Sequence, residues 1–183
     1  MTNDQKIELL TYVRQYYEHT LLGQAMPSLP PDPFYEKESG LFVTLHRQGE
    51  LRGCIGYIVG YKSLKNALRD MAHAAAFDDH RFLPLEASEL ELIDIEISIL
   101  SELADVHDYH DILIGVDGIL LKNASKSAVF LPQVASEQGW DLKTTLKHLC
   151  LKAGLSVKAY KDPSTSFQVF TAEVFSEKEF TLV

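Results

Sequence analysis

The chain has 183 residues, of which 46% are hydrophobic, and its net charge is −9. This length and composition suit one compact domain with an ample core, with room for a smaller lobe. The acidic balance and the lack of any Lys or Arg block argue against nucleic-acid binding, which needs a basic patch to neutralise phosphates. Apolar runs stay shorter than the roughly 20 residues that span a bilayer, and the first residues lack the pattern of a signal peptide. The two cysteines have no C-x-x-C spacing, which predicts a reduced, cytoplasmic protein.

The first predicted element is a helix over residues 2–23. Thr2 and Gln5 fit a capping box, and apolar side chains then recur at helical spacing until Gly23. Residues 27–33 contain four prolines, so they predict an irregular surface connection.

A β-hairpin is predicted next, with strands over residues 41–47 and 50–57 and a turn at Gln48 and Gly49. The turn decides which residues lie beside the single cysteine of the second strand, Cys54. Two registers are open, and a shift by one residue between them exchanges the two faces of the strand.

A two-residue loop pairs Arg47 with Glu50 and places Val43 opposite Cys54, which favours a packed thiol. After a shift by one residue, the Cys54 face would carry Phe42, Thr44 and His46 instead. That second register favours a polar site.

The second hairpin strand carries a thiol, a cation and two glycines in close succession. Arg52 and Cys54 should point to one face, roughly 6.6 Å apart at Cα. A nearby guanidinium favours a thiolate over a thiol. Alternatively, Cys54 is a small buried hydrophobe, and Gly53 and Gly56 allow a helix to pack tightly on the strand.

A helix is predicted over residues 63–77, followed by the acidic and basic segment 78–81. Acids at the end of a helix oppose its dipole, which suggests that they are kept as partners for Arg81 or Arg52. We therefore expect Asp79 and Arg81 to contact the strand of Cys54. The alternative is a solvated loop with an internal Asp79–Arg81 pair.

Residues 89–100 form the clearest strand, because isoleucines alternate with polar residues. One face of this strand should be buried in the core and the other exposed to solvent, as in an antiparallel sheet. The following segment, 105–111, predicts a connection with a short helical turn. His107 and His110 would share a helix face, but no third ligand is placed, so we expect no metal site and no cofactor.

The C-terminal part predicts a hairpin over residues 118–122 and 127–131, a helix over 141–153, a final strand over 166–174 and a peripheral tail from 176 onward. Cys150 lies next to the apolar face of the predicted helix and is interpreted as core.

Nucleotide-binding and hydrolase motifs such as G-x-G-x-x-G, the Walker loop and G-x-S-x-G are missing from the sequence. Cys54 is therefore the only candidate nucleophile with a neighbour, Arg52, that could activate it. His46 or His80 could act as its base, although spacing shows neither pairing.

The run L-R-G-C-I-G of residues 51–56 resembles the signature of the AMMECR domain family, which in prokaryotes is also called protein A of the AmmeMemoRadiSam system. Five further segments resemble the family in its order: residues 42–45, 79–84, 97–101, 131–134 with 139–140, and 152–155. The resemblance covers residues 5–176 as a single domain of two intertwined subdomains and leaves 177–183 as a C-terminal tail. It implies an α+β fold, with a mainly antiparallel sheet, packed helices, a smaller lobe, and a cleft between the two subdomains with the signature beside it. It implies no reaction, so enzymatic activity stays open.

Two functions follow from this resemblance and from the residues. In prokaryotes, genes of the family often sit beside those for a Memo-like protein and a radical SAM enzyme, which implies a partner or scaffold in a shared pathway. Alternatively, a cleft lined by Arg52 and Cys54 could take a small anionic substrate, with Cys54 as the catalytic nucleophile. The candidate binding residues are Thr44, His46, Arg52, Gly53, Gly56, Asp79 and Arg81.

Overall fold

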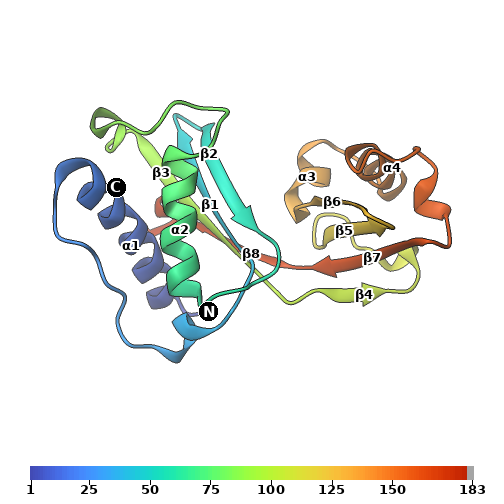
Figure 1. Ribbon diagram of the computed structural model, residues 1–183, viewed down its shortest axis with the longest axis horizontal. Coiled ribbons are helices and arrows are strands. Elements are labelled where there is room, and N and C mark those ends of the chain that lie inside the picture. Colours follow the sequence, from blue (N-terminus) through green and yellow to red (C-terminus); the bar gives the residue numbers. More distant parts are fainter. Residues whose placement is uncertain (181–183) are drawn as a thin grey trace. The chain divides into compact units, whose positions relative to one another are not determined.

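The computed structural model describes residues 1–180, which divide into two compact units (Figure 1). One unit combines Met1–Leu100 with the segment that begins at Glu173, and the other is Ser101–Ala172. Each unit has a four-stranded sheet and helices, so the fold is α+β, as predicted.

The sheet of the first unit has the strand order β2-β1-β3-β8. Its strands are β1 (Leu41–Arg47), β2 (Glu50–Tyr57), β3 (Ile93–Leu100) and β8 (Ala172–Ser176). The helices α1 (Asn3–Leu22) and α2 (Leu64–Phe77) pack on this sheet, and short 3₁₀ turns lie at Pro33–Glu36 and Ala87–Glu89. Figure 1 shows α1 and α2 side by side over the strands.

Helix α1 begins and ends as its sequence predicts. The Thr2 side chain accepts a hydrogen bond from the Gln5 amide, and the Gln5 side chain accepts one from the Thr2 amide, which completes the capping box. Gly23 ends the helix with a φ of 73°, a conformation that favours glycine.

Strand β3 keeps the predicted alternation, but its second face is not uniformly wet. Ile93, Ile95 and Ile97 lie in the core below the helices. On the other face, Asp94 and Ser98 are also buried, so the prediction of a solvated face is wrong for these two residues.

The last predicted strand is in fact two strands in different sheets. β7 (Thr165–Phe170) belongs to the second unit, and after Thr171 the chain continues as β8 in the first. The short helix α5 (Glu177–Phe180) follows, and Glu177 is buried. The prediction of a peripheral tail is therefore wrong for Glu177, whereas Lys178 and Glu179 are exposed and residues 181–183 lie outside the described residues.

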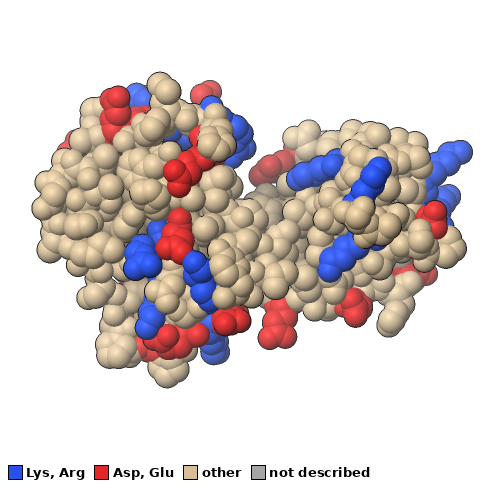
Figure 2. All heavy atoms as spheres, in the orientation of Figure 1, with Lys and Arg blue, Asp and Glu red and all other residues tan. Residues whose placement is uncertain are grey.

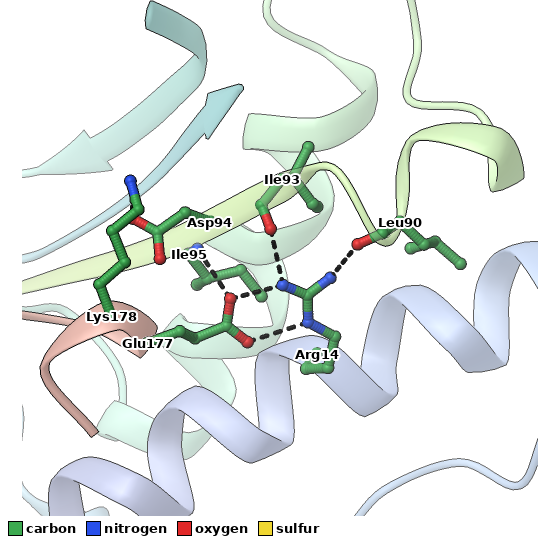
Figure 3. A network of polar contacts seen from close by, with 7 residues as sticks. All are labelled: Arg14, Leu90, Ile93, Asp94, Ile95, Glu177 and Lys178. Carbon is green, nitrogen blue, oxygen red and sulfur yellow. Dashed lines mark hydrogen bonds and ion pairs between the residues drawn. The ribbon is translucent and has the colours of Figure 1, made fainter. Parts of the chain in front are cut away.

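Glu177 is held by a network that ties the last helix to α1 and β3 (Figure 3). Its carboxylate accepts hydrogen bonds from Arg14 and from the Ile95 amide. Arg14 also donates to the carbonyl groups of Leu90 and Ile93. The network therefore fixes three segments that are far apart in sequence.

The second unit has the strand order β4-β7-β5-β6. Its remaining elements are β4 (Ala104–Val106), β5 (Gly118–Asn123), β6 (Lys126–Phe130), α3 (Pro132–Glu137), α4 (Leu142–Lys152) and 3₁₀ turns at Tyr109–Asp111 and Ala159–Lys161. The hairpin and α4 are confirmed, whereas β4 and α3 were not predicted. Cys150 lies on α4 and is fully buried in the core of this unit, which confirms its interpretation.

Among residues 1–180, no helix is long and apolar enough to cross a membrane.

Candidate functional site

The signature strand β2 pairs antiparallel with β1 through a tight turn. Gln48 and Gly49 have φ angles of 54° and 85°, as a type I′ hairpin turn requires. Arg47 pairs with Glu50, which is the register that a two-residue loop predicts.

A β-bulge changes this register one step further along the strands. His46 pairs with Leu51, but Leu45 pairs with Gly53, so Arg52 is the extra residue of β2. Beyond the bulge, Thr44 rather than Val43 lies opposite Cys54. Each of the two registers left open by the sequence is therefore found, on either side of Arg52.

The two glycines of the signature lie where other chain segments approach the strand closely. A Cβ atom on Gly53 would lie 2.2 Å from the carbonyl oxygen of Ala75 in α2. At Gly56 it would lie 2.3 Å from the carbonyl oxygen of Leu41 and from the ring of Phe42. Both glycines thus have a packing role, and Gly53 allows α2 to lie directly on β2.

Asp79 and Arg81 bind the backbone of Cys54 at the open edge of the sheet, because β2 is an edge strand. The Cys54 amide donates a hydrogen bond to the Asp79 carboxylate (2.9 Å), and Arg81 donates one to the Cys54 carbonyl (3.2 Å). The two side chains therefore take the place of a neighbouring strand at this residue and cover part of the edge. The predicted contact between this loop and the signature is confirmed.

The same two side chains are paired with each other. Arg81 donates from Nε and Nη2 to the two oxygens of Asp79, at 2.9 and 2.7 Å. Asp79 is buried, whereas Arg81 is exposed, so the loop is not simply solvated. The hydrogen bonds from Arg81 hold the pKa of Asp79 well below its usual range, against the opposing effect of burial.

The Cys54 thiol is half-buried and accepts a hydrogen bond from the Thr44 hydroxyl at 3.3 Å. Burial raises the pKa of this thiol, and the carboxylates of Asp79 and Glu96 raise it further. The Thr44 hydrogen bond and the Arg81 charge lower it, but the net shift is upward. A thiol with a raised pKa is mostly protonated near neutral pH, and the protonated form is a poor nucleophile.

Arg52 does not act on the thiol as the sequence suggested. Its guanidinium donates two hydrogen bonds to Glu89, at 2.9 and 2.8 Å, and one to the carbonyl of Pro84 at 3.4 Å. Arg81 is the cation that acts on Cys54. The prediction that the Arg52 charge stabilises a thiolate is wrong, because the bulge and Glu89 direct the guanidinium elsewhere.

Glu89 was not recognised as part of the site, although it connects several parts of it. It accepts hydrogen bonds from Arg52, Arg47 and the Glu86 amide, and the bonds from Arg52 lower its pKa. Its sequence position, at the start of a predicted strand, carries no signal for this partnership. The partnership arises only when β2 and the segment before β3 come together.

An open pocket of about 580 Å³ lies beside this cluster. Its lining residues are Arg47, Arg52, Phe82, Leu83, Pro84, Glu86, Ser88, Glu89 and Leu92. Two of these lining residues are exposed to solvent, Leu83 to 83% and Leu92 to 47%. The pocket therefore combines paired charges with apolar side chains that face solvent.

The candidate base His46 lies on the same face of β1 as Thr44, where its partners across the sheet are Leu51 and Asp94. Within residues 1–180, no hydrogen bond joins Cys54 to His46 or to His80. Thr44 lies between Cys54 and Glu96 across three strands, so the row on this face holds a thiol, a hydroxyl and a carboxylate.

A metal site has no support in the described part of the chain, where no group of three or more His, Cys, Asp or Glu side chains could hold an ion. His110 pairs with Asp108 at 2.6 Å, in a 3₁₀ turn of the second unit.

Replacing Asp79 with Asn should make stability less dependent on pH. The depressed pKa of Asp79 stabilises the fold fully above its ordinary pKa of about 3.9, and this contribution is lost as pH falls through the lower folded value. We expect Asp79→Asn to cost about 1–3 kcal/mol at pH 7 and progressively less below about pH 4, measured by urea unfolding. Asp78→Asn, at an exposed neighbour, is the control. A deficit that stays constant between pH 7 and about pH 3 would contradict the assignment.

Comparison with family models identifies the family, and relatives match over most of the chain. The family model described as AMMECR1 matches residues 10–175. A protein of Methanothermobacter thermautotrophicus is 38% identical over 97% of this chain and 96% of its own length. One of Methanopyrus kandleri is 39% identical over 86% of this chain and 80% of its own. The crystal structure of an uncharacterised protein from Pyrococcus horikoshii superposes with a TM-score of 0.81 at 32% identity, covering 92% of this chain and 89% of that one.

Proposed function

Because the chain belongs to the AMMECR1 family, we propose that it is a non-enzymatic partner in a cytoplasmic pathway with a Memo-like protein and a radical SAM enzyme. The resemblance of the signature to protein A of the AmmeMemoRadiSam system supports this pathway. The proposed role is to bind one of these two proteins and to hold it, or its substrate, in place.

The observation that carries this proposal is that polar groups of the signature bind within the protein, whereas apolar side chains beside them face solvent. Most of the signature's polar groups bind within the protein, since Nε and Nη2 of Arg52 donate to Glu89 and the Asp79–Arg81 pair binds the Cys54 backbone. A protonated thiol is a poor nucleophile, and a guanidinium paired with a carboxylate is poorly placed to bind a substrate.

The apolar side chains beside these groups are free to bind a partner. Leu83 and Leu92, which are 83% and 47% exposed, line the pocket of about 580 Å³ together with Phe82. Leu51, which is 42% exposed, precedes Arg52 in the chain. Exposed apolar residues that gather around arginines are typical of protein–protein interfaces, where a few anchors supply most of the binding energy. We name Leu51, Phe82, Leu83 and Leu92 the leucine rim.

Binding of the purified chain to each of the two pathway proteins tests the proposal, for example by isothermal titration calorimetry. Leu83→Asp should weaken the binding by about tenfold or more, because it places an unpaired charge in the interface. Leu113→Asp is the matched control, since Leu113 is 60% exposed but lies in the second unit. Failure of both proteins to bind, or equal effects of the two variants, would refute the proposal.

The alternative is a binding protein or enzyme for a small anionic molecule held by Arg52. It is favoured by the pocket of about 580 Å³, where Arg47 and Arg52 both reach the lining, and by the Arg52 Nη1 atom, which lacks a hydrogen-bond partner among the described residues. A ligand would have to compete with Glu89 for the guanidinium. Native mass spectrometry of the purified chain would detect such a ligand, and an Arg52→Gln variant should then lose it.

A further inference from the structure

A second pocket, of about 360 Å³, lies wholly within the second unit. It is formed where the 3₁₀ turns Tyr109–Asp111 and Ala159–Lys161 meet the start of α4. Its lining residues are Tyr109, His110, Asp141, Leu142, Lys143, Tyr160 and Lys161. This volume is within the range of pockets that hold small ligands.

Aromatic rings fixed by the core form one wall of this pocket. Tyr109 packs edge-on against Tyr160, with ring centroids 5.4 Å apart and an angle of 88°, and it also contacts Phe167. Tyr160 is only 5% exposed, so it holds Tyr109 in place from the core side, and the half-buried Tyr109 is the ring that a ligand can reach. Rigid aromatic walls are suited to stacking against a planar ring.

Two lysines lie beside this wall, and neither forms an ion pair with any residue from 1 to 180. The Lys161 ammonium lies 5.7 Å from the centre of the Tyr160 ring, and Lys143 lies in the first turn of α4. Figure 2 shows several separate Lys and Arg side chains on the visible face of the second unit, with Asp and Glu side chains at its edge.

One acid, Asp141, also lines the pocket. Its carboxylate accepts a hydrogen bond from the Thr144 amide at 2.7 Å and caps α4, and its bonds with Thr144 and the charge of Lys143 lower its pKa. Asp108 is paired with His110. The two ammonium groups outnumber the single carboxylate among the lining residues, so the pocket is suited to an anion.

We propose that this pocket binds a planar aromatic molecule that carries an anionic group, with the ring against Tyr109 and the anion between Lys143 and Lys161. A nucleoside monophosphate and an aromatic carboxylate share this chemistry. The proposal concerns the second unit alone and is independent of partner binding at the leucine rim.

Titration of the full chain with adenosine monophosphate and with indole-3-acetate tests the proposal, followed by NMR chemical shifts. Adenosine and inorganic phosphate, each lacking half of the ligand, are the comparison probes. At least one of the two aromatic anions should bind more tightly than both comparison probes, and the stronger of the two identifies the kind of anion. Addition of this anion should shift the NMR signals of the protein at Tyr109 and Tyr160.

The variants Lys143→Gln and Lys161→Gln should each weaken this binding by about tenfold, since each removes one charge-assisted contact. Lys122→Gln is the matched control, because Lys122 is an exposed lysine of the same unit that bonds to Gln168 instead. All three positions are exposed, so the variants should fold, and unchanged thermal unfolding verifies this. Absence of binding by both aromatic anions, equal binding by inorganic phosphate, or an equal loss in Lys122→Gln would overturn the proposal.

Discussion

Arg14→Met should destabilise the protein by about 3–5 kcal/mol, the largest effect that we expect from a single substitution. Glu177 is 1% exposed, and without Arg14 its carboxylate would keep only the hydrogen bond from the Ile95 amide. The carbonyl groups of Leu90 and Ile93 would lose a donor at the same time. Breaking a buried ion pair by removing one partner leaves an uncompensated charge, which costs more than the pair itself contributes.

Urea unfolding at pH 7 measures this loss. The matched control is Arg69→Met, because Arg69 is exposed and its guanidinium lies 3.5 Å from Asp70 on the surface. Such a pair contributes only about 0–1 kcal/mol. Equal losses in the two variants would show that the network of Figure 3 is not a structural link between α1, β3 and α5.

Gly53→Ala should cost about 3 kcal/mol, at the upper end of the range for overpacked sites. The added methyl group would lie 2.2 Å from the Ala75 carbonyl oxygen. Neither group can rotate away, because the Cβ position is fixed by the backbone of β2 and the carbonyl belongs to the backbone of α2. Either α2 or β2 must move, and a displaced β2 would also weaken the hydrogen bonds of Asp79 and Arg81 to Cys54.

The loss is measured by urea unfolding, with Leu51→Ala on the same strand as the control. Leu51 is 42% exposed, and surface substitutions usually change stability by less than about 0.5 kcal/mol. A Gly53→Ala protein as stable as the wild type would refute the close packing of α2 on the signature.

Local sequence signals predicted much of the fold. The capping box of Thr2, the hairpin turn at Gln48 and Gly49, and the cap of α4 at Asp141 each rest on contacts between neighbouring residues. Such contacts are visible in a short stretch of sequence, so the corresponding elements were predicted with nearly correct bounds.

Features set by distant segments could not be predicted in this way. The bulge at Arg52 accompanies the approach of α2 to Gly53, and the pairing of Arg52 with Glu89 needs two segments 37 residues apart. The break at Thr171 separates two strands that alternate as one in sequence. Glu177 looks like an exposed acid of a tail until Arg14 is placed beside it.

The candidate site shows the same division. The contact of the Asp79 loop with the signature was predicted because both segments place polar residues among apolar ones and both resemble motifs of the family, and because acids are unfavourable at the end of a helix. The cation that acts on Cys54 was misassigned, because Arg52 is two residues away in sequence whereas Arg81 is brought in by the fold.

The rate of Cys54 alkylation as a function of pH tests most directly whether the signature thiol is structural rather than catalytic. The measurement is the iodoacetamide rate at Cys54 and Cys150 in the native protein, by peptide mass spectrometry between about pH 6 and pH 10. An ordinary cysteine has a pKa near 8.5, and burial raises that of Cys54. We therefore predict slow modification at pH 7, a rate that still rises above about pH 9, and a further decrease in Arg81→Gln, where the favourable charge is gone. A rate at Cys54 that is already maximal below about pH 7 would reveal a stable thiolate and contradict the account.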